Sequence, residues 1–271
     1  MGGVPSPPAV ALPSEILGSA QVPTLASRAH RWCNPRLPFS ARSPALSALF
    51  VAGAHTDVGK TYIACALIRA ARARGLSVDG LKPVVSGFDE SDWSASDPGR
   101  LIQALGWPST ADNLAALSPW RYRAPLSPPM AAALEGASLN FEDAVRVCRR
   151  RVFESTADLM VIEGVGGLMS PITEDHTGLD LMAALAIPAV MVGGSYLGAI
   201  SHTLTALAAA RARDVGIRVL IVSESAAGDA PFQETVASLT RLAAPLTVIG
   251  APRNADGVVA GAILDACSIT P

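Results

Sequence analysis

Charged and aromatic residues are scarce in this chain, and each shortage excludes a class of protein. Only 16% of the 271 residues are Asp, Glu, Lys or Arg, and only 5% are aromatic. Low charge argues against a coiled coil, while 50% hydrophobic content argues against a wholly disordered chain. The 23 glycines and 21 prolines follow no collagen-like repeat. The composition fits a globular α/β enzyme best.

The chain also has little excess charge of either sign. Its 21 basic and 23 acidic residues give a formal net charge of -2. No overall basic field therefore draws it to nucleic acid or to an anionic membrane, and we expect neither as a partner. Any phosphate must be bound by a local site.

Cysteine is rare and long hydrophobic runs are nearly absent. The four cysteines form no C-x-x-C pair and have no neighbouring histidine pair, so no zinc site is indicated and a reducing, cytoplasmic location is expected. One uncharged run, residues 181–200, is long enough to span a bilayer. Pro188, Gly193, Gly194 and Ser195 divide it, which favours a short helix, a buried strand and a turn instead.

The first 47 residues differ in composition from the remainder. They hold eight prolines, seven serines, four arginines and a single acidic residue, and show no sustained periodicity. We expect residues 1–47 to be a disordered extension and 48–271 to form one domain. A transit peptide is the alternative, although the prolines would interrupt an amphipathic helix.

From residue 48 onward, short apolar runs alternate with helix-length amphipathic stretches. This alternation predicts an α/β domain with a mostly parallel sheet covered by helices on both faces. We expect strands at 48–52, 78–83, 159–163, 189–192, 217–223 and 246–249, and helices at 60–74, 98–105, 141–155, 179–186, 200–214 and 232–242.

A glycine-rich loop lies between the first predicted strand and the first predicted helix. Residues 53–61 read GAHTDVGKT, and Gly59-Lys60-Thr61 supplies loop amides, a cation and a hydroxyl for phosphates and Mg²⁺. The strict pattern G-x-x-x-x-G-K-T requires glycine at position 54, where this chain has Ala54 after Gly53. The sequence therefore predicts a P-loop that is a near match.

Polar residues also stand at the ends of two predicted strands and at the start of a predicted helix. Glu163 ends the apolar run 159–163 before a glycine loop, which suits a magnesium-binding acid beside the P-loop strand. Lys82 finishes the second strand, at the sheet edge where ligands of open α/β sheets bind. Ser96-Asp97 begins a predicted helix, either as an ordinary N-cap or as part of the site.

Taken in order, these motifs resemble those of the dethiobiotin synthetases. The resemblance runs from about residue 48 to 255 and rests on the ordered set rather than on any single motif. The matching segments are 53–61 (GAHTDVGKT), 82–87 (KPVVSG), 96–97 (SD), 125–128 (PLSP), 163–167 (EGVGG) and 197–202 (LGAISH).

The resemblance implies a reaction and a set of site residues. It implies a homodimeric P-loop enzyme that uses ATP, CO₂ and 7,8-diaminononanoate with Mg²⁺, through a carbamate and a carbamic-phosphoric mixed anhydride. Lys60 and Lys82 would be catalytic, and residues 198–201 would bind the substrate carboxylate in the partner subunit. Motif matching assigns the nucleotide to Thr56, Asp57, Val58, Gly59, Lys60, Thr61, Tyr62, Asp97, Glu163, Gly164, Val165, Gly166, Glu224, Ala251, Pro252 and Arg253; the metal to Thr61, Asp97 and Glu163; and the substrate to Ser86, Gly198, Ala199, Ile200 and Ser201.

The chain departs from the family pattern at three places. His55 and Ser201 stand where the family often has Asp and Asn. Glu224 lies where an adenine-reading Asn is expected, and a carboxylate accepts hydrogen bonds but donates none. The preferred base is therefore open.

Two rival functions share the architecture. The first is an ATP-dependent amidating ligase, but such chains usually add a glutaminase domain with a nucleophilic cysteine. The second is a partition-type ATPase switch, whose signature lysine would stand at His55. Neither a basic DNA-facing patch nor a basic amphipathic C-terminal helix accompanies that loop.

Overall fold

A computed structural model describes residues 47–226, 230–253 and 256–270. The extension expected at residues 1–47 lies outside the described residues, apart from its last residue. It therefore stays a prediction.

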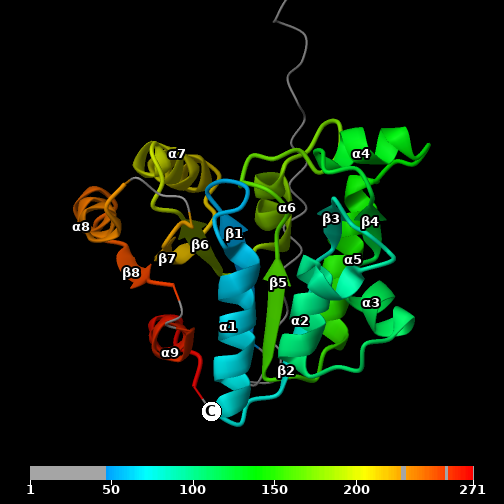
Figure 1. Cartoon of the computed structure of the whole chain (residues 1–271), viewed down its shortest axis with the longest axis horizontal. Helices are drawn as coiled ribbons and strands as arrows, with labels where there is room; N and C mark the ends of the chain where they lie inside the picture. Colours follow the sequence, from blue (N-terminus) through cyan, green and yellow to red (C-terminus); the bar gives the residue numbers. More distant parts are fainter. Residues whose placement is uncertain (1–46, 227–229, 254–255, 271) are drawn as a thin grey trace, which may run out of the picture. The chain divides into compact units, whose positions relative to one another are not determined.

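Six parallel strands form the central sheet, in the order β2-β5-β1-β6-β7-β8 (Figure 1). Their bounds are β1 (Ser47–Gly53), β2 (Val78–Leu81), β5 (Leu159–Glu163), β6 (Ala189–Gly193), β7 (Ile217–Ser223) and β8 (Thr247–Ala251). The predicted parallel α/β architecture is confirmed. Strand β1, which leads into the P-loop, pairs with β5 so that Glu163 lies opposite Val51.

Helices cover both faces of this sheet because alternate strand side chains point to opposite sides. In β1, Leu49 and Val51 belong to one apolar cluster, and Phe50 and Ala52 belong to the other. The first face carries α1 (Lys60–Ala73), α2 (Asp97–Leu105), α3 (Ala111–Leu117) and α9 (Asp256–Ala266), and the second carries α5 (Phe141–Glu154), α6 (Gly178–Leu185), α7 (Ala199–Ala212) and α8 (Phe232–Leu242).

The strand predicted at 78–83 is present but ends two residues earlier, because the chain there divides between two sheets. Strand β2 ends at Leu81, and a separate strand β3 (Val84–Ser86) pairs in parallel with β4 (Trp120–Tyr122). Pro83 lies between β2 and β3 and has no N–H to donate to a ladder. The short helix α4 (Pro128–Leu134) packs on this small sheet.

The uncharged run at residues 181–200 folds as predicted. It contains the end of α6, the fully buried strand β6, a loop and the start of α7. No helix in the described ranges has both the length and the apolar character needed to cross a membrane.

We predict that Asp180→Asn lowers the free energy of unfolding by about 1 kcal/mol at pH 7, as for the loss of a helix cap. Asp180 shares a capping box with Thr177 and accepts a hydrogen bond from Arg213 at 2.9 Å. Burial raises the pKa of Asp180, but the bonds from Thr177 and Arg213 outweigh it and lower the pKa below its usual value. The stabilisation is therefore complete above the unfolded carboxyl pKa of about 3.9 and disappears as the pH falls through the folded pKa. Denaturant titrations of both proteins at several pH values measure this, and a pH-independent difference would contradict it.

Candidate active site

The P-loop places a lysine and a hydroxyl at the start of α1. Gly59 is the N-cap residue of α1, has a left-handed φ of 92°, and makes no side-chain cap. The first amides of α1 are thus left for an anion, as phosphate-binding helix termini require. Lys60 and Thr61 follow, and both side chains are buried.

Gly53 makes room for the stem of Lys60. A Cβ atom on Gly53 would lie 2.8 Å from Cδ of Lys60 and 2.9 Å from the His55 carbonyl oxygen. Both separations are shorter than a real Cβ contact, so the lysine crosses the end of β1 only because residue 53 is glycine. Nζ of Lys60 then lies 3.4 Å from the His55 carbonyl oxygen.

A buried ion-pair network joins the motifs that were predicted to meet. Nζ of Lys82 lies 2.5 Å from Oε1 of Glu163 and 3.0 Å from Oδ2 of Asp97. Thr61 Oγ1 donates to the same Glu163 oxygen at 2.6 Å. Lys82 and Glu163 are only 2% and 1% exposed, which excludes the alternative that Lys82 is a solvated strand end. Ser96 caps α2 by accepting from the Gly99 amide, so Asp97 enters the network from the first turn of α2.

Burial and the neighbouring charges shift the pKa values of three groups in this network. Burial, reinforced by the charge of Lys82, lowers the pKa of Lys60 to about 8. Burial also acts to lower the pKa of Lys82, but Glu163 and Asp97 outweigh it and raise that pKa. Burial acts to raise the pKa of Asp97, but Lys82 outweighs it and lowers that pKa. Lys82 thus stays charged at neutral pH, and Lys60 is the lysine that is easier to neutralise.

The network fits a hard divalent cation. Oε2 of Glu163 is buried and has no hydrogen-bond partner among the described residues, so one carboxylate oxygen is left without a partner. Carboxylate and hydroxyl oxygens are ligands that Mg²⁺ prefers. The described part of the chain holds no group of three His, Cys, Asp or Glu side chains that could bind a metal alone. Two carboxylates and a hydroxyl suit a magnesium ion that is held mainly by substrate phosphates and water.

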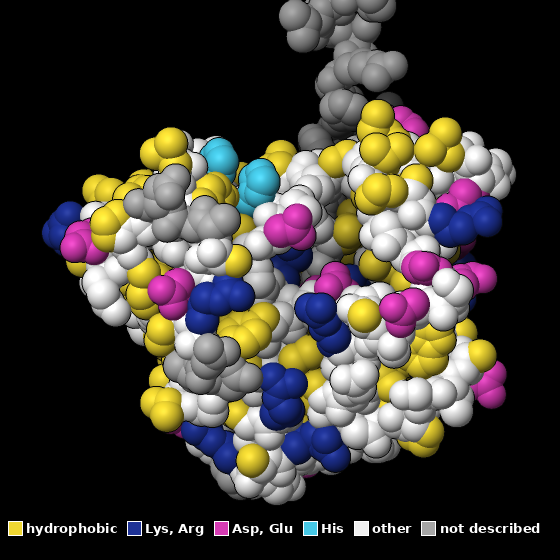
Figure 2. Space-filling model, viewed as in Figure 1, with side chains coloured by type: hydrophobic (Ala, Val, Ile, Leu, Met, Phe, Trp, Pro, Cys, Tyr) yellow, Lys and Arg dark blue, Asp and Glu magenta, His cyan; other side chains and the backbone are white. Residues whose placement is uncertain are grey.

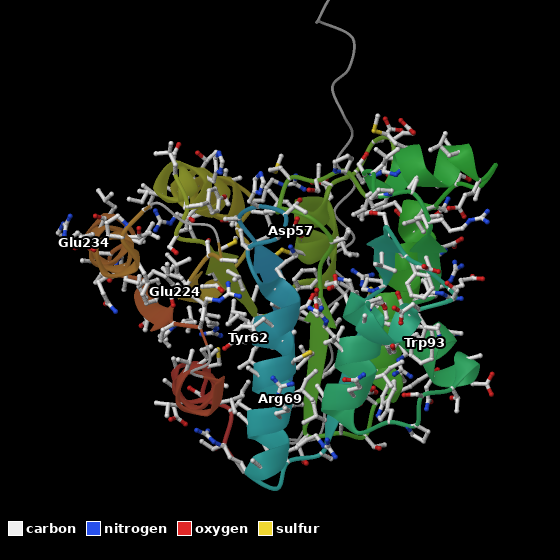
Figure 3. All side chains as sticks on the ribbon, in the orientation of Figure 1. Asp57, Tyr62, Arg69, Trp93, Glu224 and Glu234 are labelled. Atoms are coloured by element: carbon white, nitrogen blue, oxygen red, sulfur yellow. The ribbon has the colours of Figure 1, made fainter. Side chains whose placement is uncertain are left out.

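The predicted base-binding residues form a second group beside the P-loop. A Cβ on Gly59 would lie 2.7 Å from Ser223 Oγ, so the end of β7 packs against the P-loop. Glu224 follows, and its carboxylate accepts from the Arg253 amide at 2.8 Å while its own amide donates to Ala251. Figure 3 shows Glu224 on the same side of α1 as Tyr62, with Trp93 on the other side.

The predicted carboxylate-binding residues form a third group at the start of α7. Gly198 is the N-cap residue of α7, also has a φ of 92°, and makes no side-chain cap. Ser201 is exposed, as is Leu197 at 91%. The first turn of α7 therefore presents amides near an apolar surface residue.

The remaining predicted residues lie around these groups. Gly164, Val165 and Gly166 line a small cavity together with Gly53 and Pro83. A Cβ on Gly166 would lie 3.7 Å from Thr56 Oγ1, so the two glycine loops are adjacent. Within the described ranges the Ser86 side chain makes no hydrogen bond. Asp57 and Thr56 are exposed and Val58 is buried. In Figure 2, the face of the molecule that is turned to the viewer is hollowed near its centre, and basic and acidic side chains lie in the hollow.

Three interactions here were not predicted from the sequence. His55 of the P-loop stacks on His202 of α7, with ring centroids 5.2 Å apart, and the Tyr196 hydroxyl lies 2.9 Å from Nδ1 of His202. Ser195 and Ser225 exchange hydrogen bonds of 3.0 and 2.9 Å between amide and hydroxyl. Tyr196 and His202 stand six residues apart around a predicted helix start, which is the one sequence signal that could have indicated their contact.

The chain is similar to known proteins in both sequence and fold. A family profile described as an AAA domain matches residues 47–256. An ATP-dependent dethiobiotin synthetase from Phenylobacterium zucineum (strain HLK1) is 50% identical over 222 residues, which are 82% of this chain and 95% of that protein. The corresponding protein from Caulobacter vibrioides (strain NA1000 / CB15N) is 49% identical over 221 residues, which are 81% of this chain and 98% of that protein. The chain belongs to the ATP-dependent dethiobiotin synthetases.

The chain is therefore an ATP-dependent ligase of biotin biosynthesis, as the ordered motifs predicted. This membership sets aside the amidating-ligase and partition-ATPase interpretations. A hydrogenase maturation factor HypB from Archaeoglobus fulgidus has a TM-score of 0.50 and 14% identity, covering 82% of this chain and 89% of that one. At that identity the likeness supports the P-loop fold alone.

Proposed function

We propose that the chain converts ATP, CO₂ and 7,8-diaminononanoate to dethiobiotin, ADP and phosphate at the P-loop edge of the sheet. The observation that carries this is the meeting of Lys60, Thr61, Lys82, Asp97 and Glu163 at the start of α1. A triphosphate and a carbamate are both anionic, so bringing them to reaction distance needs concentrated positive charge.

In this proposal the substrate amine captures CO₂ as a carbamate, which then attacks the γ-phosphorus of ATP. The carbamate oxygen forms the new bond to phosphorus as the bond to the ADP oxygen breaks. The second amine attacks the mixed anhydride, loses a proton, and expels phosphate as the ring closes. Lys60 holds the terminal phosphates with the loop amides, while Lys82 stabilises the carbamate. The free hydroxyl of Ser86 binds the amine end.

We assign Mg²⁺ to Thr61, Asp97 and Glu163. When bound, it would neutralise part of the charge on the transferred phosphoryl group. Support comes from the unpartnered Oε2 of Glu163 and from the hydroxyl of Thr61 beside the same carboxylate. Lys60 and Lys82 carry two positive charges against the two negative charges of Glu163 and Asp97, so the site is charge-balanced until the nucleotide binds.

We also propose a homodimer in which residues 198–201 bind the substrate carboxylate in the partner subunit. The uncapped first turn of α7 suits an anion, and Leu197 beside it is 91% exposed, as an interface residue would be in one isolated copy. The base would contact Glu224 and residues 251–253, which pack beside the P-loop.

The domain limits and the cytoplasmic location remain our proposals as well. The relative from Phenylobacterium matches 222 residues of this chain yet is covered over 95% of its own length. The family profile begins at residue 47. Both observations support a P-loop domain at 48–271 with residues 1–47 as an addition to it.

The test is phosphate release from ATP with Mg²⁺ and bicarbonate, with and without 7,8-diaminononanoate, while mass spectrometry follows dethiobiotin. We expect release that depends on the diamine and matches dethiobiotin mole for mole. ATP hydrolysis that is independent of the diamine, with no dethiobiotin, would overturn the proposal. Repeating the assay with CTP and GTP tests the base contacts.

A further inference from the structure

Three rings form a contact cluster, His55–Tyr196–His202, between the P-loop and the start of α7. The centroid distances are 5.2 Å for the two histidines, 5.7 Å for Tyr196 and His202, and 5.8 Å for His55 and Tyr196. The histidine planes are only 11° apart, so the two imidazoles are stacked. The roles proposed above leave this cluster without a function.

The cluster holds His202 at the uncapped end of α7. His202 lies in the first turn of that helix, and its Nε2 is 3.9 Å from where a Cβ on Gly198 would lie. The ring therefore borders the same first turn whose amides have no side-chain cap. An anion bound there would meet the edge of this imidazole.

The hydrogen bond between Tyr196 and His202 links the phenol to the tautomer of the imidazole. The Tyr196 hydroxyl lies 2.9 Å from Nδ1 of His202, and either group can be the donor, depending on the tautomer. A phenol that donates to Nδ1 leaves the proton of a neutral imidazole on Nε2. His202 then presents an N–H donor beside the helix amides.

His55 fixes the plane of that ring from the other side. Its own Nδ1 lies 2.9 Å from the Thr56 carbonyl oxygen, which can only accept, so Nδ1 of His55 carries a proton. The His55 ring is thus anchored to the P-loop backbone and lies flat against His202.

We propose that His202 is a specificity-determining residue, whose Nε2–H donates to the substrate carboxylate alongside the amides of residues 198–201. Tyr196 and His55 are positioning residues that set the tautomer and the plane of His202. This inference rests on the proposed function, because it takes the α7 start as the carboxylate site.

The test compares the parent enzyme with His202→Phe, which keeps a stackable ring but has no N–H. We measure KM and kcat for 7,8-diaminononanoate and for its primary carboxamide, which lacks the negative charge. We expect the KM for the carboxylate substrate to rise about tenfold, as for loss of a hydrogen bond to a charged group. The KM for the carboxamide, the KM for ATP and kcat should stay within about twofold.

Further variants separate donation from packing. Tyr196→Phe should raise the KM for the carboxylate substrate about threefold, because the tautomer is no longer fixed. His202→Gln, which restores an N–H, should recover part of the loss. Thr205→Ala, at an exposed position on the same helix, is the matched control and should behave as the parent.

The outcomes distinguish the two proposals. Equal rises in KM for the carboxylate and the carboxamide would overturn the inference, since packing alone would then explain the effect. If His202→Phe left the KM unchanged for both the carboxylate and the carboxamide, the inference about His202 would also be overturned, although the proposed function would stand. Absence of dethiobiotin from the parent enzyme would overturn both.

Discussion

Lys60→Ala is expected to lower the rate of dethiobiotin formation by at least about a thousandfold, with the protein still folded. Lys60 is the cation that follows the P-loop glycine, and removing one group that stabilises developing charge commonly costs about 10²- to 10³-fold. This lysine also holds the ground-state phosphates, so ATP affinity should fall as well. Single-turnover assays and isothermal titration with ATP measure the two losses. Near-parent turnover would remove Lys60 from the mechanism.

The pH dependence of ATP binding gives this prediction a second readout. Lys60 has a pKa of about 8 in the nucleotide-free protein, because burial and Lys82 oppose its charge. The charged form binds the triphosphate, and the bound phosphates must raise this pKa. ATP affinity should therefore be nearly constant below pH 8 and fall as the pH rises above it. That decline should be absent in Lys60→Ala; its persistence would assign the titration to another group.

Lys82→Ala is expected to damage both chemistry and folding. Turnover should fall about 10²- to 10³-fold because the carbamate loses its cation, while the Kd for ATP changes by about threefold or less. The truncation also leaves Glu163 buried without its cationic partner, and breaking a buried ion pair costs about 3–5 kcal/mol. Kinetics, ATP titration and denaturant unfolding measure the three effects. An equal loss of ATP affinity in Lys82→Ala and Lys60→Ala would contradict the role given to Lys82.

A double variant separates the two effects of Lys82. Lys82→Ala/Glu163→Gln removes the unpaired buried charge, so part of the lost stability should return. Turnover should not return, since the cation is still missing and the Glu163 carboxylate assigned to Mg²⁺ is removed as well. If activity recovered together with stability, Lys82 would be a structural residue only.

The centre of the site could be predicted from the sequence because its residues stand at the ends of predicted strands. Lys82 and Glu163 each follow an apolar run, and adjacent parallel strands bring their carboxyl ends to one edge. The sequence could not predict that Asp97 would share Lys82, since the chain between them leaves the main sheet and returns through an irregular stretch. Nor did it predict that Lys82 would be almost fully buried, because burial depends on elements that pack from elsewhere.

The missed elements share a physical reason. Strands β3 and β4 have three residues each, too few to show an alternating pattern. Helices α3 and α4 have seven residues each, and α9 is apolar and contains two glycines, so no amphipathic face marks it. The stacking of His55 on His202 joins positions 147 residues apart and left no local signal.

The crowding at Gly53 bears on how such loops are recognised in other chains. The residue that must lack a side chain is the one that the lysine stem passes over, and here it stands seven residues before Lys60 rather than six. A pattern scan that insists on glycine at Ala54 would discard this chain, although its loop has the lysine, the helix start and the space they need. A scan that counts backwards from the lysine, and accepts a glycine either six or seven residues before it, would retain this chain.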